Sequence, residues 1–248
     1  MMNVDKTVII TGSSGGIGRA LLENFCKEKF NIWACSREKN KEHSDFLNGL
    51  KKKANGFIKD LYFDFENTED MKNAAQTIIN SNEKIDGLIN NAGTIHTALF
   101  QMTSVETFKK IFNINFFSQL HFTQYIIKNM IKNKSGSIVN ISSTAAFDGV
   151  DGRVAYSSSK AAIVSATKVI ASELAKFNIR VNAIAPGLTN TKMMNKNHSE
   201  ENINKTLDKI PLKRIAEPKE IADATFFLIS NKSSYITGQT LRVDGGME

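Results

Sequence analysis

The chain has 248 residues, of which 41% are hydrophobic and 23% are charged, and its net charge is +7. This composition is typical of a globular protein with a sizeable buried core, and it excludes a disordered chain. No apolar run approaches the roughly 18 residues of a membrane span. The N-terminus lacks the features of a signal peptide and the chain has only two cysteines, so we expect a cytoplasmic protein.

The positive charge has two interpretations. An anionic partner such as nucleic acid, a phosphorylated cofactor or an acidic carrier protein would explain it. The alternative, which we favour, is a lysine-rich surface without a single target. Because the chain has no basic stripe interleaved with aromatic residues and no zinc-finger spacing, we expect no nucleic-acid partner. The histidines and cysteines lack metal-ligand spacing, and we expect no metal site.

A glycine-rich turn lies near the N-terminus. Thr7 to Ile10 is a short apolar run typical of a strand buried on both faces, and Thr11 to Gly18 follows it, then a helical pattern. Strand, glycine-rich turn and helix place backbone N–H groups and a helix N-terminus against a pyrophosphate. We expect Gly12 to permit the tight turn, Gly16 to let the backbone approach a phosphate, and Gly18 to allow close helix–strand packing.

The second predicted strand, Asn31 to Ser36, ends about 20 residues after the glycines, where a dinucleotide fold places the group that meets the adenosine ribose. An acidic residue there would bind a free 2′-hydroxyl and repel a 2′-phosphate. This chain instead has neutral Ser36 and cationic Arg37, whose guanidinium suits a phosphate. The other interpretation of Arg37 is a solvated loop charge. With the glycine turn beside it, we favour NADP(H) over NAD(H).

Two further strands follow. The third lies within Phe57 to Phe65, and Asp64 near its end either accepts from the adenine amino group or assists the helix that begins near Thr68. The residues leave these two roles equally open. The fourth strand, Asp86 to Asn90, runs into the small-residue stretch Asn91 to Gly93, which lets backbone approach a ligand.

Regular alternation of strands and helices predicts an α/β protein with a Rossmann-like, doubly wound parallel sheet flanked by helices. No repeat or linker divides the chain, so we expect one domain over residues 1–248. A fifth strand, Ser137 to Ile141, leads directly to Ser143. Because ligands bind beyond the carboxyl ends of such strands, the glycine turn, the stretch before Gly93, Ser143 and Tyr156 should meet in one crevice.

Tyr156 and Lys160 are four residues apart and share one face of a predicted helix. An ammonium about 4 Å from the phenol would favour the phenolate by roughly 4 kcal/mol at an effective dielectric constant near 20. This corresponds to the roughly three pKa units that a tyrosine must lose to exchange protons near pH 7. The alternative is a chance pair on a solvated helix face.

Two helices indicate self-association. The pattern from Ser104 to Asn133 is helical, and Phe116 to Ile131 is apolar round much of its circumference, so it lies deep in the core or meets another subunit. The small-residue helix after Tyr156 could pack against a copy of itself. We therefore expect a homo-oligomer with two-fold interfaces, a tetramer.

The polar, Asn-rich segment from Leu188 to Lys209 contains Met193 and Met194. It is predicted to be a mobile flap over the substrate, lined by these flexible methionines. The alternative is a surface loop with two core methionines.

Several motifs together resemble those of the short-chain dehydrogenase/reductase family. The resemblance runs from Thr7 to Met247. The motifs, in the family's order, are Thr11-Gly12-xxx-Gly16-x-Gly18, Asn90-Asn91-Ala92-Gly93, Asn115, Ser143, Tyr156-xxx-Lys160 and Pro186-Gly187.

The resemblance implies a set of catalytic roles. Tyr156 is expected to be the general acid that protonates the carbonyl oxygen, and Lys160 to lower its pKa and bind the nicotinamide ribose. Ser143, thirteen residues before the tyrosine, is expected to hydrogen-bond the substrate carbonyl and the developing oxyanion. Asn115 is expected to hold a water that links Lys160 to solvent.

The resemblance also implies a cofactor site. The backbone around Pro186 to Thr189 and the hydroxyl of Thr191 are expected to hold the nicotinamide carboxamide and the diphosphate. The full expected set is Gly12, Ser14, Gly16, Ile17, Gly18, Ser36, Arg37, Asp64, Asn91, Ala92, Gly93, Tyr156, Lys160, Pro186, Gly187, Thr189 and Thr191.

Within the family, the C-terminal stretches Ile210 to Ala222 and Ile236 to Gly246 resemble those of 3-oxoacyl-(acyl-carrier-protein) reductases. This resemblance implies an NADPH-dependent carbonyl reductase of fatty acid biosynthesis that acts on a carrier-bound substrate. The +7 charge suits an acidic carrier, and Lys134 stands where those enzymes have a basic carrier contact.

The chain also departs from that pattern near the expected substrate. After Gly93 it reads Thr94-Ile95-His96-Thr97 rather than Ile-Thr-Arg-Asp, and Arg153 and Ala155 replace Gln and Asn. Phe177 replaces another basic carrier contact. A dehydrogenase of a small ketone, sugar or secondary alcohol is therefore the alternative enzyme. A non-catalytic dinucleotide-binding sensor is the alternative from another class.

Overall fold

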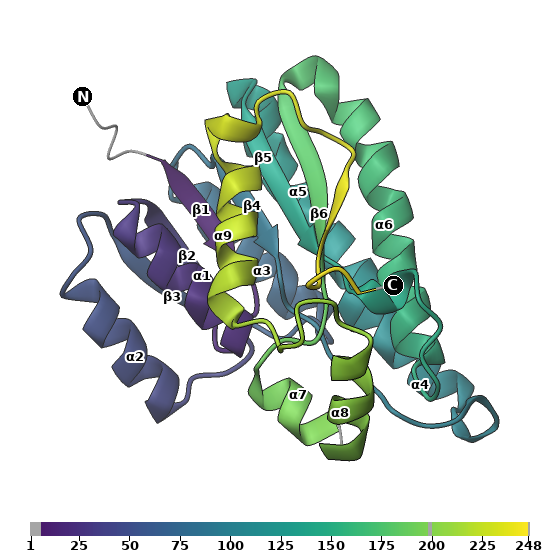
Figure 1. Cartoon of the computed structure of the whole chain (residues 1–248). Coiled ribbons are helices and arrows are strands. Elements are labelled where there is room, and N and C mark those ends of the chain that lie inside the picture. The colour runs from purple at the N-terminus through teal and green to yellow at the C-terminus, as the bar shows by residue number, and fades with distance from the viewer. Residues whose placement is uncertain (1–5, 198–199, 248) are drawn as a thin grey trace.

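Seven parallel strands form one sheet in the computed structural model, which describes residues 6–197 and 200–247 (Figure 1). The order across the sheet is β3-β2-β1-β4-β5-β6-β7. Because β1 pairs with both β2 and β4, the strand order reverses beside β1, where doubly wound sheets bind ligands. The strands are β1 (Thr7–Ile10), β2 (Asn31–Ser36), β3 (Ile58–Tyr62), β4 (Gly87–Asn90), β5 (Gly136–Ile141), β6 (Ile179–Pro186) and β7 (Thr240–Val243).

Helices cover both faces of this sheet, which confirms the predicted fold class. One face packs against α1 (Gly16–Lys27), α2 (Lys41–Lys51) and α9 (Pro218–Ile229), which lie in front of the sheet in Figure 1. The other face packs against α3 (Thr68–Asn80), α5 (Ser118–Asn133) and α6 (Val154–Leu174).

The strand β1 shows why its sequence is apolar throughout. Val8 and Ile10 belong to the core cluster on the α1 side, whereas Ile9 belongs to the cluster on the α5 side. Alternate side chains of a strand point to opposite faces, so a strand covered on both faces has no position for a polar side chain.

The predicted helix from Ser104 to Asn133 is divided in the structure. It consists of α4 (Val105–Phe112), a π-helical turn (Asn113–Phe117) and α5. Ser104 caps α4, because its side chain accepts a hydrogen bond from the backbone N–H of Thr107. The wider turn places Asn115 entirely in the interior, beneath the carboxyl ends of the strands.

The segment predicted as a flap, Leu188 to Lys209, contains α7 (Lys192–Asn197) and α8 (Glu200–Asp208), and its residues 198–199 lie outside the described residues. Figure 1 shows both helices beyond the carboxyl ends of the strands, apart from the two helical layers. In the part of the chain that the structure describes, no helix has the length and apolarity to cross a membrane.

Candidate active site

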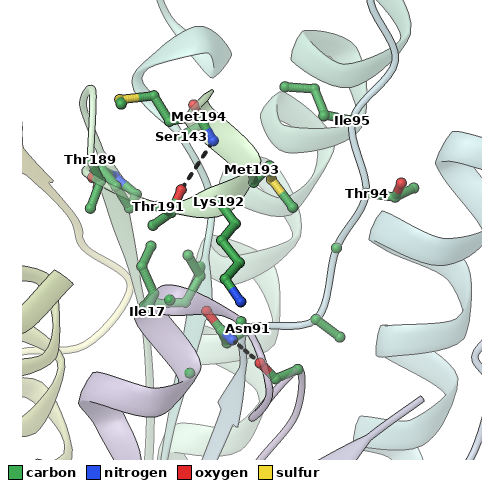
Figure 2. A pocket seen from close by; sticks show the side chains of 18 of the residues that line it. Ile17, Asn91, Thr94, Ile95, Ser143, Thr189, Thr191, Lys192, Met193 and Met194 are labelled. Carbon is green, nitrogen blue, oxygen red and sulfur yellow. Dashed lines mark hydrogen bonds between the residues drawn. The ribbon is translucent and has the colours of Figure 1, made fainter. Parts of the chain in front are cut away.

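A cleft of about 960 Å³ lies at the carboxyl ends of the strands. Every residue that the sequence predicted to bind the cofactor lines it, from Gly12 to Thr191. Figure 2 shows side chains from several elements around this space, among them Ile17 of α1, Asn91 after β4, Ser143 after β5 and Thr189 after β6. Of the four predicted catalytic residues, Ser143, Tyr156 and Lys160 line the cleft and Asn115 does not.

The glycine turn has the close approaches that require glycine. Gly12 has a φ of +64°, and a Cβ there would lie 2.8 Å from the Cα of Ala92. A Cβ at Gly18 would lie 2.2 Å from the carbonyl oxygen of Gly12. At Gly16 we expected a phosphate to approach the backbone, and in the structure the Thr191 side chain packs against this glycine. The Cγ2 atom of Thr191 would lie 2.8 Å from a Cβ added at Gly16.

The N-terminus of α1 is suited to an anion. Gly15 is the N-cap residue and provides no side-chain cap, and the first turn contains no acidic residue. The first backbone N–H groups of a helix have no acceptor within the helix, and the helix dipole favours negative charge at this end. Residues Gly15 to Arg19 line the cleft, so this end of α1 fits the diphosphate of a dinucleotide.

Thr11 and Asn91 join the glycine turn to the stretch after β4, a connection that sequence reasoning did not identify. The Thr11 hydroxyl accepts hydrogen bonds from the backbone N–H groups of Asn91 and Ala92, at 3.0 and 3.1 Å. The Asn91 amide donates to the carbonyls of Thr11 and Gly12, each at 3.0 Å. Two loops that are about 80 positions apart in the sequence therefore form one wall of the cleft.

The end of β2 has the electrostatic character that the sequence predicted. Ser36 is buried, and its hydroxyl donates to the carbonyl of Glu38 at 3.5 Å. Arg37 is exposed and lies 3.8 Å from the Glu38 carboxylate, a long and solvated ion pair. The Arg37 guanidinium is thus an exposed cation at the rim of the cleft.

Asp64 also lines the cleft, and its carboxylate accepts a hydrogen bond from the backbone N–H of Glu66 at 2.9 Å. The helix α3 has a different cap: Asn67 accepts hydrogen bonds from the N–H groups of Glu69 and Asp70. Asn67 therefore caps α3, and both roles that the sequence left open for Asp64, a contact to adenine and a charge that assists this helix, stay predictions.

Tyr156 is half-buried in the first turns of α6 and is hydrogen-bonded to Ser143. Burial of the phenol raises the pKa of Tyr156, whereas the hydrogen bond from Ser143 and the positive charge of Arg153 act in the opposite direction. Burial is the largest of the three, so the phenol keeps its proton at neutral pH.

Lys160 corrects one expectation from the sequence. Its ammonium donates to the carbonyl of Ile141 at 2.8 Å and lies 5.9 Å from the centre of the Tyr156 ring. We expected this ammonium to lower the pKa of the phenol, but in the structure the pKa of Tyr156 is raised and the opposing cation is Arg153. Burial also lowers the pKa of Lys160 itself to about 8.

The two serines after β5 have different partners. The Ser142 hydroxyl donates to the backbone carbonyl of Lys160 at 2.9 Å and so ties β5 to α6. The Ser143 hydroxyl accepts from the N–H of Ala145 at 3.2 Å and is the one bonded to Tyr156. Of the two serines, Ser143 is therefore the one whose hydroxyl contacts the phenol of Tyr156.

Asn115 lies behind the cleft and is fully buried. Its side-chain oxygen accepts from the N–H of Thr94 at 2.8 Å, and its amide donates to the carbonyl of Thr94 and the hydroxyl of Ser159, at 2.9 and 3.0 Å. These bonds hold Asn115 against Thr94 and α6, and the water expected at Asn115 stays a prediction. Ser159, which sequence reasoning did not identify, also donates to the carbonyl of Tyr156 at 2.7 Å.

The flap segment contacts the cleft through α7. The N–H of Met194 donates to the Thr191 hydroxyl at 3.2 Å, a bond that Figure 2 marks. Met193 and Met194 both line the cleft, as the flap interpretation requires. Lys192 donates to both carboxylate oxygens of Glu42 in α2, at 2.9 Å each, so an ion pair connects α7 to α2.

Within the described residues no group of three or more His, Cys, Asp or Glu side chains is arranged to hold a metal ion.

Comparison with known proteins gives the following relatives. A family model described as "Enoyl-(Acyl carrier protein) reductase" matches residues 12–248. The chain is 36% identical over 245 residues to a 3-oxoacyl-(acyl-carrier-protein) reductase, FabG, of Thermotoga maritima, which covers 98% of this chain and 97% of that protein. It is 35% identical to an acetoacetyl-CoA reductase of an Acinetobacter strain over 253 residues, 99% of each chain.

A solved structure described as a "short chain dehydrogenase/reductase family protein" matches with a TM-score of 0.85 and 29% identity. The match covers 97% of this chain and 96% of that one. The likeness therefore extends over the whole sheet and the cleft at its carboxyl end.

Proposed function

The chain belongs to the short-chain dehydrogenase/reductase family and is an oxidoreductase of the CH–OH/C=O pair, and we propose that it reduces 3-oxoacyl thioesters with NADPH. The family implies a nicotinamide dinucleotide as cofactor. One observation supports the carbonyl chemistry above the others: Ser143, Tyr156 and Lys160 meet at one end of a cleft whose other walls are the glycine turn and the end of β2.

In this proposal Ser143 and Tyr156 bind the ketone oxygen together. Both side chains carry hydroxyl donors, and their existing hydrogen bond places them within reach of one acceptor atom. The nicotinamide, when bound, supplies the hydride. Tyr156 then gives its proton to the oxygen on which negative charge develops, and its raised pKa keeps that proton available at neutral pH.

The role that we propose for Lys160 rests on the geometry of the same site. Lys160 is buried, and the carbonyl of Ile141 fixes its ammonium at 2.8 Å. Its pKa of about 8 leaves it mostly protonated at pH 7 but able to lose a proton at small cost. We propose that Lys160 binds the nicotinamide ribose and returns a proton to Tyr156 after each turnover.

The preference for NADPH rests on the end of β2. Ser36 is neutral, Arg37 is a rim cation, and no acidic side chain occupies either position. A 2′-phosphate would gain charge-assisted hydrogen bonds from the guanidinium, whereas a 2′-hydroxyl would gain little.

The choice of substrate is supported by the relatives. Two of them carry names that describe the reduction of a 3-oxoacyl thioester, one on a carrier protein and one on coenzyme A. The description of the family model instead names an enoyl reductase, which would reduce a carbon–carbon double bond. We favour the ketone because both of these relatives are named for reduction of a ketone, and because Ser143 and Tyr156 would give two donors to the oxygen that becomes the hydroxyl group.

A substrate panel tests this proposal. NADPH oxidation is followed with a 3-oxobutanoyl thioester on acyl carrier protein and on coenzyme A, with the matching 2-enoyl thioester, and with a small ketone. We expect turnover of the two 3-oxoacyl thioesters above the rest. Turnover of the enoyl thioester alone would overturn the proposal, and cofactor binding without any turnover would indicate a sensor.

We also propose a cytoplasmic homotetramer. Phe117, on the π-helical turn, is 57% exposed and contacts the rings of Phe112 and Phe116, and Val169 on α6 is 56% exposed. Apolar side chains on both helices support the two interfaces that the sequence predicted. Sedimentation of Phe117→Asp and Val169→Asp tests this: each variant should fall to a smaller assembly, and a monomeric unmodified protein would contradict it.

A further inference from the structure

Arg242 in β7 binds two carboxylates at once. Its Nε donates to Asp244 at 2.6 Å, and its two terminal nitrogens donate to the two carboxylate oxygens of Asp148 at 3.3 and 3.0 Å. The contact with Asp148 has the two-pronged geometry in which a guanidinium fixes a carboxylate most firmly. The side chain of Arg242 is 33% exposed and those of Asp148 and Asp244 are 27% and 8% exposed, so water and salt screen these ion pairs less than they screen pairs on the open surface.

These bonds join segments that are far apart in the sequence. Asp148 lies in the loop after β5, where its N–H donates to the carbonyl of Thr144, the residue after Ser143, at 3.0 Å. The nitrogen of Arg242 that binds Asp148 at 3.0 Å also donates to the backbone carbonyl of Met247 at 2.8 Å. One guanidinium therefore holds the loop after β5 against the residues that follow β7.

The residues that follow β7 also contact the segment after α8. Asp244 accepts a hydrogen bond from the N–H of Gly246 at 3.1 Å, which closes a turn in which Gly245 and Gly246 both have positive φ. The N–H of Leu212 donates to the carbonyl of Gly245 at 3.2 Å. The turn that Arg242 and Asp244 hold is therefore also in contact with the chain just beyond the flap segment.

Two apolar residues in the segments that Arg242 joins line the cleft. Val150 follows Asp148 by two positions, and Met247 provides the carbonyl that Arg242 binds; both line the same cleft as Tyr156. Val150 is 43% exposed, so its side chain has apolar surface that a ligand can cover. Arg242 itself is not among the described residues that line the cleft, so any effect on a ligand acts through these segments.

We propose that Arg242 is a positioning residue for the acyl chain of the substrate, because its bonds to Asp148 and Met247 hold together the two segments on which that chain lies. This inference rests on the proposed reduction of 3-oxoacyl thioesters. In a 3-oxobutanoyl group only a methyl lies beyond the ketone, whereas a longer acyl group extends along the cleft and buries methylene groups against an apolar wall. Loss of Arg242 should therefore weaken the binding of long chains more than that of short ones.

The test compares the coenzyme A thioesters of 3-oxobutanoate and 3-oxodecanoate, which share the reacting ketone and differ in chain length. Arg242→Met keeps much of the side-chain volume but loses the charge and the donors. It should raise KM for the longer substrate about tenfold more than KM for the shorter one, the loss expected when roughly two methylene groups are no longer buried. The effect should fall on KM rather than kcat, because the wall binds the chain equally in the ground state and the transition state. Arg242→Lys, which keeps the charge and loses the fork, should lie between Arg242→Met and the unmodified enzyme.

The matched control is Arg214→Met. Arg214 also binds a carboxylate through two nitrogens, with Glu220 at 2.7 and 2.6 Å, but it is exposed and does not line the described cleft. Its loss should leave the ratio of the two KM values unchanged.

A second variant, Asp148→Asn, weakens only one of the two ion pairs and leaves Asp244 to hold Arg242. It should shift the ratio of KM values in the same direction as Arg242→Met, but by less. The double variant should shift the ratio no further than Arg242→Met alone, because both changes remove the same contact.

Two results would overturn the inference while leaving thioester reduction standing. If Arg242 only stabilised the fold, Arg242→Met would lower the thermal stability and change both KM values by the same factor. A rise in KM for NADPH as large as that for the longer substrate would also contradict a role confined to the acyl chain. If the unmodified enzyme turned over neither thioester, the proposed function would fail, and this inference with it.

A further measurement needs no variant. Decanoyl coenzyme A should inhibit the unmodified enzyme at least tenfold more strongly than butanoyl coenzyme A, in competition with 3-oxobutanoyl coenzyme A, because about six more methylene groups lie on the wall. Equal inhibition by the two compounds would overturn the inference, since the cleft would then have no wall that binds the chain.

Discussion

Opposing effects act on the pKa of Tyr156. Burial raises the pKa of its phenol, while the Ser143 hydroxyl and the Arg153 charge stabilise the phenolate. For a reductase the balance is useful, because the proton donor must hold its proton at the operating pH and release it only to the developing oxyanion. Activity should therefore persist at neutral pH, and the protonated phenol should be lost as the pH rises through the pKa of Tyr156.

Ser143→Ala tests this balance. Removing the hydroxyl removes one of the two effects that lower the pKa of Tyr156, so the alkaline limb of kcat/KM should move to higher pH. Loss of a donor to the oxyanion should lower kcat about 10²-fold as well. Ser142→Ala is the matched control, because its hydroxyl bonds the Lys160 carbonyl and not Tyr156. A limb that moves to lower pH in Ser143→Ala would contradict the assignment.

Arg37→Ala tests the cofactor preference. The guanidinium is exposed and has only a long contact to Glu38, so its loss should cost the fold little. KM for NADPH should rise on the order of 10- to 100-fold, while KM for NADH should change little. Lys39→Ala, which removes the next cation along the same loop, should affect both cofactors weakly. Equal effects of Arg37→Ala on the two cofactors would argue against the phosphate contact.

At this scale the sequence predicted which residues gather in the cleft better than it predicted what they touch. Lys160 was expected beside the phenol from the helical spacing, but its ammonium bonds the carbonyl of Ile141, nineteen positions away. The same holds for Thr11 and Asn115, whose partners come from other loops. Contacts between distant segments depend on the fold, and helical or strand periodicity carries no information about them.

The glycine turn between β1 and α1 is the element on which the cofactor end of the cleft depends. Its N–H groups are available only because the helix begins close against the turn, and Gly18 permits that approach. A side chain at Gly18 would collide with backbone, which cannot move away as a flexible side chain can.

Gly18→Ala should therefore destabilise the protein by at least about 3 kcal/mol, because the added Cβ would lie 2.2 Å from the Gly12 carbonyl oxygen. Gly15→Ala is the matched control in the same turn. Its φ is −75°, and the nearest atom to its added Cβ is 3.6 Å away, so the change should stay within about 1 kcal/mol. Thermal unfolding of both variants checks the difference, and equal loss of stability would contradict it.

Strands and helices were the most predictable elements, since β1, β2, β4 and β5 are short, mainly apolar runs bounded by polar or small residues. The π-helical turn at Asn113–Phe117 was not predicted, because an extra residue in one turn barely alters the periodicity of a long helical pattern. Helix α8 lies within the segment predicted as a flap. Its sequence has few apolar residues, so their helical spacing is hard to recognise.

Burial of the protonated Lys160 side chain lowers the stability of the whole protein. The pKa of its ammonium falls from 10.5 to about 8 on folding, so the folded state binds its proton less tightly than the unfolded chain does. Below about pH 8 both states are protonated and the full cost is present. Between about pH 8 and 10.5 the unfolded chain binds more protons, so this contribution makes stability rise with pH.

Lys160→Met should therefore raise the free energy of unfolding at pH 7 by about 1–2 kcal/mol, after allowing for the bond lost at the Ile141 carbonyl. The gain should shrink as the pH rises above about 8, where the folded protein releases this proton. Denaturant unfolding at several pH values measures it. A variant that is less stable than the unmodified chain at pH 7 and relatively more stable at high pH would contradict the sign.

The sheet explains how residues from segments far apart in the sequence reach one cleft. All seven strands are parallel, so their carboxyl ends meet at one edge, and β1 lies where the order reverses. The sequence predicted this arrangement from alternation of strands and helices alone. It did not predict that Arg153 is buried, because that burial depends on how α6 packs against β6 and the neighbouring segments.

The most direct test of the account follows the hydride and the proton in a single turnover. The enzyme is mixed with NADPH that carries deuterium on its transferable position and with a 3-oxobutanoyl thioester, and the product is analysed by mass spectrometry. We predict one deuterium at the former ketone carbon, and we predict that Tyr156→Phe still binds NADPH but forms product at least about 10²-fold more slowly. Deuterium at the neighbouring carbon, or undiminished turnover by Tyr156→Phe, would contradict the assignment of this protein as a carbonyl reductase whose proton comes from Tyr156.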